Sequence, residues 1–397
     1  MKILALMDAD WFFKGPHQYH HLLELLSFNG HEIIVVDYEN YWHLSKGPLF
    51  SPAKTFQNVC RFYEDANITV IRPSFIRIPL LDYLSFLLSS KTQIKHLIND
   101  FKPDVIIGFT GIISVYWGMK QGIKKDIPVI YYWLDVIHEL IPLKIAKPLA
   151  KILEKKIIKN SASNIAINEL LKDYMINMGA DPVNTHVVRG GVDFKRFDPK
   201  IIDGNLIREK YGISEDDRLL FFMGWIYEFS GLEEVIRDML ILKDQNPGLK
   251  LMIVGHGDYY STLKEIVKNN KIEDRVIFTG KRPYNEIPQL IGAADICLLP
   301  AHNNEIMKDI VPIKMYEYLA MDKPVICTAL PGVMKEFGQD NGVIYVNRSE
   351  DVMKKVLNLT ESDINLNKAK AKDFIKDYDW DKIITLFQEI LGDLKQV

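Results

Sequence analysis

A proline, a lysine and a glutamate lie close together between Pro312 and Ile326, and their spacing suits the start of a helix. Proline is favoured in the first turn of a helix, where its missing N–H is not needed. The backbone N–H groups of that turn lack partners within the helix, so they can bind an anion such as a diphosphate. Lys314 and Glu317 are three residues apart and share one helix face, where the carboxylate could accept both hydroxyls of a ribose. The alternative, a surface helix with an ordinary lysine–glutamate pair, fits the segment equally well.

Polar residues also follow an apolar run in the first half of the chain. The sequence from Ile130 to Glu139 is typical of a strand end and the loop after it, a usual place for functional residues. Asp135 and His138 are the candidate catalytic residues of this loop, and the alternative for Asp135 is a helix N-cap. A Gly-x-Gly pattern at Gly255 and Gly257 is a weaker signal, because it is also typical of an ordinary tight turn.

The elements that must position these residues follow one pattern, in which short apolar runs alternate with longer amphipathic segments. Such alternation predicts parallel strands joined by helices. In the first half we expect strands at 3–7, 33–36, 105–107, 129–132 and 165–167, and helices at 17–28 and 81–99. In the second half we expect strands at 219–223, 251–254, 276–278, 296–299 and 324–327, and helices at 231–243, 260–269, 284–293 and 312–321. The pattern predicts a two-domain α/β protein, which also fits a dehydrogenase, a periplasmic-type binding protein or an epimerase.

Length, charge and cysteine content narrow the class of protein. A chain of 397 residues suits two domains, and a net charge of −3 creates no field that would attract nucleic acid. The three cysteines, Cys60, Cys297 and Cys327, are far apart in the sequence, which argues against a disulfide framework or a zinc site and favours a cytoplasmic protein. No apolar stretch reaches the roughly 18–20 residues of a membrane span.

The segment Lys144–Lys159 is locally basic, with six lysines and a single acid, Glu154. Lys147, Lys151 and Lys155 are four residues apart and share one face of a helix. The apolar residues are expected largely on the opposite face: Ile145, Leu149, Ile152, Leu153 and Ile157. The segment therefore predicts either a solvated helix face or peripheral contact with anionic lipids on the inner face of the cell membrane.

Taken together, the motifs of the second half resemble those of the retaining family-4 glycosyltransferases. These enzymes have the GT-B fold, in which two Rossmann-like βαβ domains face each other across a central cleft. The matching motifs are Gly190-Gly191-Val192-Asp193 with Phe197, Val254-Gly255-His256-Gly257-Asp258, Val276-Ile277-Phe278-Thr279-Gly280, Ala293-Ala294-Asp295-Ile296, and Pro312-Ile313-Lys314 with Glu317-Tyr318-Leu319-Ala320. The resemblance implies an acceptor-binding domain at 1–188, a nucleotide-sugar-binding domain at 189–372 and a C-terminal helix at 373–397 that packs back on the first domain.

The resemblance also implies roles for single residues on the donor side. Glu317 matches the glutamate that binds the nucleotide ribose, and Lys314 and Met315 belong to the same donor-binding signature. Asp309 falls where the family has a first glutamate that binds the donor sugar, and Glu305 could substitute for it. The glycines and the serine expected at the donor are Gly224, Ser230 and Gly255.

In the first half the resemblance covers less of the chain. Gly15 and His17 lie in the match to the acceptor loop. His17, His20 and His21 are expected to be surface residues rather than catalysts. In the family, a histidine or aspartate at the position of Asp135 and His138 approaches the reacting sugar.

One departure concerns the phosphates of the donor. The family carries an arginine and a lysine after the first strand of the second domain, whereas this chain has Trp225 and Ser230 there. A diphosphate buried without cations is poorly stabilised. Three interpretations stay open: the phosphates bind helix-end amides with Lys314 or Lys308, the donor carries a single phosphate, or the protein is weakly active or inactive.

These observations predict a retaining glycosyltransferase that moves a hexose-type sugar from a nucleotide-sugar donor to a glycan, a lipid-linked acceptor or a small molecule. We expect it to need no cofactor and no metal, because the GT-B resemblance comes without an Asp-x-Asp metal motif at a strand end. The alternatives are a GT-B sugar-nucleotide epimerase and a weakly active or inactive GT-B protein that serves as a sugar-binding or scaffold subunit.

Overall fold

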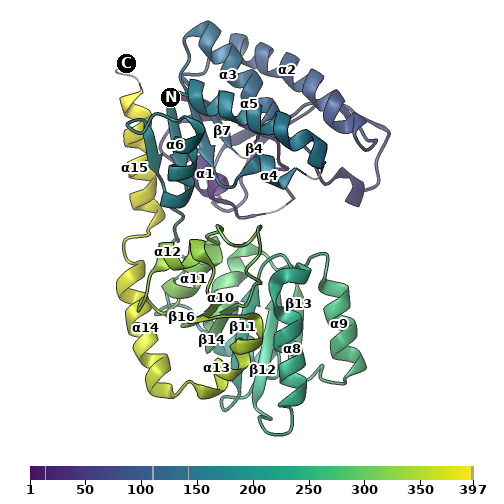
Figure 1. Ribbon diagram of the computed structural model, residues 1–397, viewed down its shortest axis with the longest axis vertical. Helices are drawn as coiled ribbons and strands as arrows, with labels where there is room; N and C mark the ends of the chain where they lie inside the picture. Colours follow the sequence, from purple (N-terminus) through teal and green to yellow (C-terminus); the bar gives the residue numbers. More distant parts are fainter. Residues whose placement is uncertain (14, 110, 142, 395–397) are drawn as a thin grey trace. The chain divides into compact units, whose positions relative to one another are not determined.

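The computed structural model describes residues 1–13, 15–109, 111–141 and 143–394, which form two units (Figure 1). Unit 1 comprises Met1–Arg189 and the chain from Ile383 onward, and unit 2 comprises Gly190–Lys382. The boundary between the two units therefore lies after residue 189, one residue beyond the expected boundary at 188. Unit 2 continues past residue 372 because helix α14 (Glu361–Ile375) packs Ala371 and Ile375 into its core.

Unit 1 is built on an eight-stranded sheet in the order β10-β9-β8-β7-β1-β2-β5-β4, with β4 antiparallel to β5 and the other neighbours parallel. Its strands are β1 (Lys2–Met7), β2 (Glu32–Val36), β4 (Lys54–Val59), β5 (Ile68–Arg72), β7 (Val105–Phe109), β8 (Val129–Trp133), β9 (Ser163–Ala166) and β10 (Thr185–Val187); β3 (Phe50–Ser51) and β6 (Phe75–Ile76) form a separate pair. Its helices are α1 (Gln18–Phe28), α2 (Leu81–Phe101), α3 (Ile113–Lys125), α4 (Ile137–Leu140), α5 (Lys147–Asn160) and α6 (Glu169–Met178).

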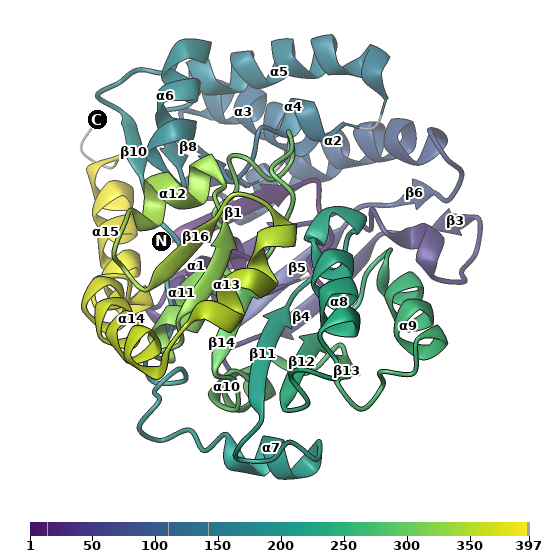
Figure 2. The same cartoon turned by 60° about the horizontal axis from the view of Figure 1, so that its bottom comes forward.

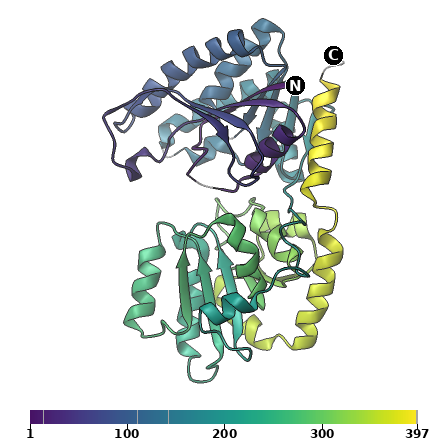
Figure 3. The same ribbon diagram turned by 180° about the vertical axis from the view of Figure 1, so that it is seen from behind.

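Alternate residues of the buried strands face opposite layers, as β8 shows. Tyr131 and Trp133 belong to the core beneath α2, α3, α5 and α6. Tyr132 faces the other way, with its ring 6.0 Å from that of Phe387 in α15 (Trp380–Asp393). The end of α15 also lies beside α1, where the Asn29 side-chain amide donates to Gln388 at 3.2 Å (Figures 1 and 3).

Unit 2 is built on a six-stranded parallel sheet in the order β13-β12-β11-β14-β15-β16 (Figure 2). Its strands are β11 (Arg218–Met223), β12 (Leu249–Val254), β13 (Val276–Gly280), β14 (Ile296–Leu299), β15 (Val325–Thr328) and β16 (Val343–Val346). Its helices are α7 (Asn205–Lys210), α8 (Leu232–Ile241), α9 (Tyr260–Asn269), α10 (Ile287–Gly292), α11 (Ile313–Ala320), α12 (Pro331–Phe337), α13 (Val352–Asn358) and α14. This strand order is that of a Rossmann-like sheet.

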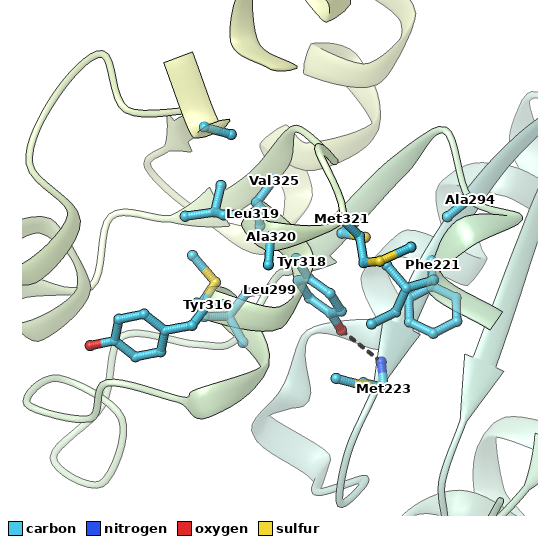
Figure 4. Close-up of a cluster of buried hydrophobic side chains, with 14 of the residues drawn as sticks. Phe221, Met223, Ala294, Leu299, Tyr316, Tyr318, Leu319, Ala320, Met321 and Val325 are labelled. Atoms are coloured by element: carbon cyan, nitrogen blue, oxygen red, sulfur yellow. Dashed lines mark hydrogen bonds between the residues drawn. The ribbon is translucent and has the colours of Figure 1, made fainter. Parts of the chain in front are cut away.

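Two cores cover the faces of this sheet. Leu220, Phe222 and Leu251 pack with α8, α9 and α13 on one face. Phe221 and Met223 pack with α10, α11, α12 and α14 on the other. Figure 4 shows part of this second core, where the backbone N–H of Met223 donates to the Tyr318 hydroxyl at 2.9 Å. Helix α11 is thereby fixed against the last residue of β11.

The predicted strands and helices are confirmed in position, most within two residues at each end. The surface-helix interpretation of 312–321 is wrong, because six of the eight residues of α11 are buried. The expectation that His20 and His21 lie on the surface is also wrong: both are fully buried against rings that include Trp11, Phe62 and Tyr63.

The apolar residues expected opposite the lysines of α5 are not all buried. Leu149 and Ile152 are 61% and 54% exposed, and Ile145, in the turn before the helix, is 91% exposed. Only Ile157 and Ile158 of the long apolar side chains on α5 are buried. Among the described residues, no helix is long and apolar enough to cross a membrane.

Candidate functional site

The order of the strands in unit 2 reverses between β11 and β14, the position where open parallel sheets bind ligands at the carboxyl ends of their strands. We call this place the β11–β14 edge: the ends of β11 and β14, the loops 224–231 and 300–312, and the first turn of α11. Four of the expected donor-binding residues meet here or beside it. They are Gly224, Gly255, Lys314 and Glu317.

At this edge, Gly224 allows the Lys314 amine to approach closely, and Gly255 allows the close approach of the Gly224 backbone. Gly224 has φ +136°, and a Cβ there would lie 2.6 Å from the Lys314 Nζ. Gly255 has φ +133°, and a Cβ there would lie 2.0 Å from the carbonyl oxygen of Gly224. A side chain at either position would be strained and would displace its neighbour, so the two loops pack main chain against main chain.

Lys314 reaches from α11 to the end of β11. Its ammonium donates to the Met223 carbonyl at 2.6 Å and lies 4.3 Å from the centre of the Phe222 ring. Burial lowers the pKa of Lys314 to about 8, and the nearby Glu317 carboxylate opposes that shift. The side chain is therefore a half-buried cation, held by a carbonyl and able to bind an anion with its remaining N–H donors.

Glu317 lies one turn further along α11 and is only 3% exposed. The Tyr284 hydroxyl donates to its Oε1 at 2.7 Å, and the Arg196 guanidinium lies 4.9 Å from the Tyr284 ring. Burial raises the pKa of Glu317 to about 7, and the Tyr284 hydrogen bond, Lys314 and Arg196 limit the rise. A buried carboxylate with one oxygen held by a phenol can accept further hydroxyl donors with the other.

Neither of the residues that replace the expected cations brings a charge to this edge. The indole N–H of Trp225 donates to Asp258 at 3.0 Å. Ser230 is 5% exposed, and its hydroxyl accepts the backbone N–H of Tyr227 at 2.9 Å within a short 3-10 turn. Trp225 therefore links the loop after β11 to the loop after β12, and Ser230 orders its own turn.

The remaining donor-side candidates lie in different surroundings. Met315 is fully buried in the core, so its side chain supports α11 from below. Glu305 is on the exposed loop 300–312, where it pairs with Lys308 at 2.6 Å. The same loop is fixed near Asp309 by its contact with Gly332. The backbone N–H of Gly332 donates to the Lys308 carbonyl at 2.7 Å. A Cβ on Gly332 would lie 2.7 Å from the Asp309 backbone, so only glycine allows this approach.

In unit 1, His138 follows β8 and is held by a buried glutamate. The His138 Nδ1 lies 2.5 Å from Glu154 of α5, and Glu154 also accepts from the Tyr131 hydroxyl and the Trp133 indole. The other ring nitrogen, Nε2, lies 3.4 Å from the Tyr174 hydroxyl. With 1% exposure, His138 is an oriented, buried group.

Asp135 lies three residues before His138 and is half-buried. Burial raises the pKa of this carboxyl to about 7. Asp135 is not the N-cap of α4, because Val136 occupies that position. Of the two catalytic candidates, Asp135 is thus the more accessible.

The acceptor-side candidates lie around the start of α1. Gly15 has φ +140°, and a Cβ there would lie 3.1 Å from the rings of both His20 and Phe62. The backbone N–H of His17 donates to His20 Nδ1 at 3.0 Å, and His20 Nε2 lies 3.0 Å from the Trp11 carbonyl. Burial lowers the pKa of His20, which is therefore a neutral residue that shapes this loop.

Three residues of these sites were not predicted from the sequence. Tyr284 and Arg196 come from loops far from Glu317 in the chain, and Glu154 lies among lysines that suggested a solvated helix. The only available signal is that a buried carboxylate needs donors. Among the described residues, no group of three or more histidines, cysteines, aspartates or glutamates is placed to hold a metal ion.

Comparisons with known families identify both halves of the chain. Residues 203–377 match the family described as glycosyl transferases group 1, and residues 18–196 match glycosyltransferase family 4. Among curated relatives, a D-inositol 3-phosphate glycosyltransferase of Salinispora arenicola is 24% identical over 71% of this chain and 68% of its own length. An alpha-monoglucosyldiacylglycerol synthase of Streptococcus pneumoniae is 24% identical over 68% of this chain. The chain spans 61% of that synthase, and 62% of an uncharacterized glycosyltransferase of Methanocaldococcus jannaschii that is 22% identical over 62% of this chain.

Solved structures show the same fold over nearly the whole chain. HepE of Anabaena, solved in complex with UDP, superposes with a TM-score of 0.70 at 16% identity and covers 99% of this chain and 100% of its own. A sucrose-phosphate synthase from Thermosynechococcus elongatus superposes with a TM-score of 0.76 at 14% identity, with complete coverage of both chains. The expected GT-B fold class, with two Rossmann-like domains, is confirmed.

Proposed function

The chain belongs to the group 1, family-4 glycosyltransferases, and on that premise we propose that it moves a hexose-type sugar from a nucleotide-sugar donor to a hydroxyl acceptor with retention of the anomeric configuration. One observation carries the proposal. At the β11–β14 edge, a buried carboxylate and a half-buried amine from one face of α11 lie beside the glycine-lined end of β11.

These two groups suit the two polar ends of a nucleoside diphosphate. The Glu317 carboxylate would accept the ribose hydroxyls with the oxygen that Tyr284 does not hold. The Lys314 ammonium and the first-turn amides of α11 would bind the phosphates and stabilise the charge that develops on the leaving group. This division of roles supports the first of the three interpretations of the altered phosphate site, because Trp225 is hydrogen-bonded to Asp258 and Ser230 to the backbone of Tyr227.

The sugar end of the donor has fewer candidates. We assign Asp309 to the orientation of the sugar, with Glu305 as the alternative on the same loop. On the unit 1 side, Asp135 would approach the reacting sugar, and His138, fixed by Glu154, would position the loop after β8. Gly15 and His17 would belong to the acceptor side.

The donor and the acceptor are proposed by chemical class. HepE was solved with UDP and with UDP-glucose, so a UDP-hexose is the first donor to test. One relative is named for an inositol phosphate and another for a glycolipid that it makes, so the proposed acceptor is a hydroxyl of a lipid-linked molecule, a glycan or a small polyol.

The test is a comparison of two buried glutamates. Wild-type protein, Glu317→Gln and Glu336→Gln are screened by thermal shift against UDP, GDP, ADP and CMP sugars, since a ligand of the native state raises stability by mass action. Glu336 is the matched control, because it is 9% exposed and accepts a tyrosine hydroxyl, from Tyr316, at 3.0 Å. Hydrogen bonds to a charged group contribute about 1.5–3 kcal/mol each, so Glu317→Gln should weaken donor binding about a hundredfold.

The reaction is then followed with the donor that binds. Release of sugar or its transfer to an acceptor, with the anomer of the product assigned by NMR, would establish a retaining transferase. Equal donor binding by wild type and Glu317→Gln would refute the assignment of the site. Tight donor binding without hydrolysis or transfer would instead favour a sugar-binding subunit, the alternative that the missing cations at 225 and 230 suggest.

A further inference from the structure

Three neighbouring helices of unit 1 are rich in lysine and poor in exposed acids. Helices α2, α3 and α5 cover one face of the sheet, where α3 lies between the other two (Figure 1). Together they contain ten lysines and no arginine, nine of the lysines being exposed. Their acids are Asp82 and Glu154, both buried, and the exposed Asp100. The whole chain has 49 basic and 52 acidic residues, so this charge is segregated. We call the outer side of these helices the lysine face.

The lysine face also exposes large aliphatic side chains. Leu84 and Leu88 of α2 are 58% and 66% exposed. The turn before α5 and the helix itself add Ile145, Leu149 and Ile152, at 91%, 61% and 54%. Exposed apolar side chains of this size are unremarkable singly, but their gathering among lysines on neighbouring helices marks an interaction surface.

Apolar and basic residues are interleaved on this face. The exposed Leu149 and Ile152 lie in the first half of α5 with Lys147 and Lys151 beside them. At the end of α3, Ile123 is 54% exposed and precedes Lys124. In the middle, the amines of Lys91 and Lys120 lie 4.7 and 5.7 Å from the centre of the half-buried Trp117 ring.

We propose that the lysine face binds the surface of an anionic phospholipid bilayer. Aliphatic side chains can enter the boundary between head groups and acyl chains while lysines contact the lipid phosphates. Long lysine side chains also lay their stems over apolar surface and keep the charge in the head-group layer, as Lys91 and Lys120 do on Trp117.

Other polyanionic or protein partners fit this face less well. Lysines can bind nucleic-acid phosphates, but nucleic-acid sites usually add arginine contacts and aromatic platforms for the bases, whereas these helices have no arginine and expose leucine and isoleucine. The cores of protein interfaces are depleted in lysine. The proposal is independent of the proposed sugar transfer and concerns a surface without any of the donor-side residues.

The test is sedimentation with vesicles. The full chain is mixed with vesicles of phosphatidylcholine alone and with vesicles that contain about one third phosphatidylglycerol, at low and high salt. The wild type should sediment with the anionic vesicles only, and high salt should release it. A charge variant, Lys151→Glu/Lys155→Glu/Lys156→Glu, should bind at least about tenfold more weakly. An apolar variant, Leu149→Ser/Ile152→Ser, should lose binding at low salt as well.

The matched control makes the same charge change elsewhere. Lys264→Glu/Lys268→Glu/Lys271→Glu alters three exposed lysines at and after α9 of unit 2 and should sediment like the wild type. Equal thermal unfolding of all variants, and equal hydrolysis of a soluble nucleotide sugar, would show that fold and donor site are intact. The proposal fails if the wild type ignores anionic vesicles, if the control loses as much binding as the charge variant, or if the face binds a polyuridine RNA in preference to vesicles.

Discussion

Charged side chains are buried at the carboxyl edges of both sheets, but the groups that they contact differ. In unit 1, Arg72 at the end of β5 donates to Asp37 at 3.0 Å and to Asp10 at 2.8 Å, and all three are buried. In unit 2, Lys314 and Glu317 are held by a carbonyl and by a phenol. The first cluster satisfies its charges internally, whereas the second leaves an amine and a carboxylate with unused hydrogen-bonding capacity.

The difference separates structural from functional polar residues. The two clusters come from different places in the sequence, since Arg72 ends a strand whereas Lys314 and Glu317 lie on helix α11. In unit 1 a guanidinium with five donors joins two strand ends, so the charges serve the fold. In unit 2 the pKa of Glu317 is raised and that of Lys314 lowered by burial without a fully matched partner, as is common at ligand sites. Four predictions test this contrast.

The largest effect is expected at Arg72. Arg72→Met leaves Asp37 and Asp10 buried without their cation, and breaking a buried pair in this way costs about 3–5 kcal/mol of unfolding free energy. Urea unfolding measures it. Arg237→Met is the control, because Arg237 is 63% exposed and its pair with the half-buried Glu233 should change stability by less than about 0.5 kcal/mol. A small loss at Arg72 would mean that unit 1 does not depend on this cluster.

At Lys314 we expect the opposite result, in which donor binding weakens while the free energy of unfolding does not fall. Lys314→Met removes a half-buried amine whose lowered pKa shows that burial disfavours its charge, so the free energy of unfolding at neutral pH should stay equal or rise. Donor affinity should fall about tenfold, because a charge-assisted contact to phosphate is lost. Calorimetric titration with the donor and urea unfolding give the two values. Destabilisation with unchanged donor affinity would reverse the roles assigned to the two edges.

The smallest effect is expected from pH. The pKa of Glu317 is about 7 and that of Lys314 about 8, so donor affinity should rise as pH increases through 7 and fall as pH increases through 8. Glu317→Gln should abolish the acidic limb and keep the basic one. Donor titrations between pH 5.5 and 9 measure both, with the acidic limb a change of about tenfold.

The same carboxyl gives stability a pH dependence of known sign. Its folded pKa of about 7 lies above its ordinary value of 4.5, so the folded protein holds this proton more tightly between those values. The contribution of Glu317 to stability is therefore present below pH 4.5 and declines as pH rises toward 7. Glu317→Gln should flatten this part of the stability profile, and an unchanged profile would contradict the raised pKa.

The sequence predicted the parts of the structure that repeat a local pattern. The βα alternation placed most strands and helices, and Pro312 with the spacing of Lys314 and Glu317 located the start of α11. The strands β3 to β6, β10 and β16 were not predicted, because two to six residues without clear alternation carry little signal. The helices α3, α6, α7, α12 and α13 were not predicted either.

The partners of the site residues could not be predicted, since they depend on tertiary contacts. Tyr284 holds Glu317 across 33 residues of sequence, and Arg72 joins strand ends 35 and 62 residues away. Serine and tryptophan at 230 and 225 were recognised as departures, but only the structure shows that they bind Tyr227 and Asp258. The exposure of Leu149 and Ile152 was missed because helical spacing identifies the faces of α5 and not which of them the sheet covers.

The packing of Gly224 and Gly255 has a consequence for how this protein can change. A single-base change in the first two positions of a glycine codon adds a side chain, and at these positions the side chain would strike Lys314 or the opposing backbone. Substitutions of these two glycines should therefore be poorly tolerated. Changes in what this edge binds would therefore have to arise from the side chains around it, such as Trp225 and His256, and not from the two glycines.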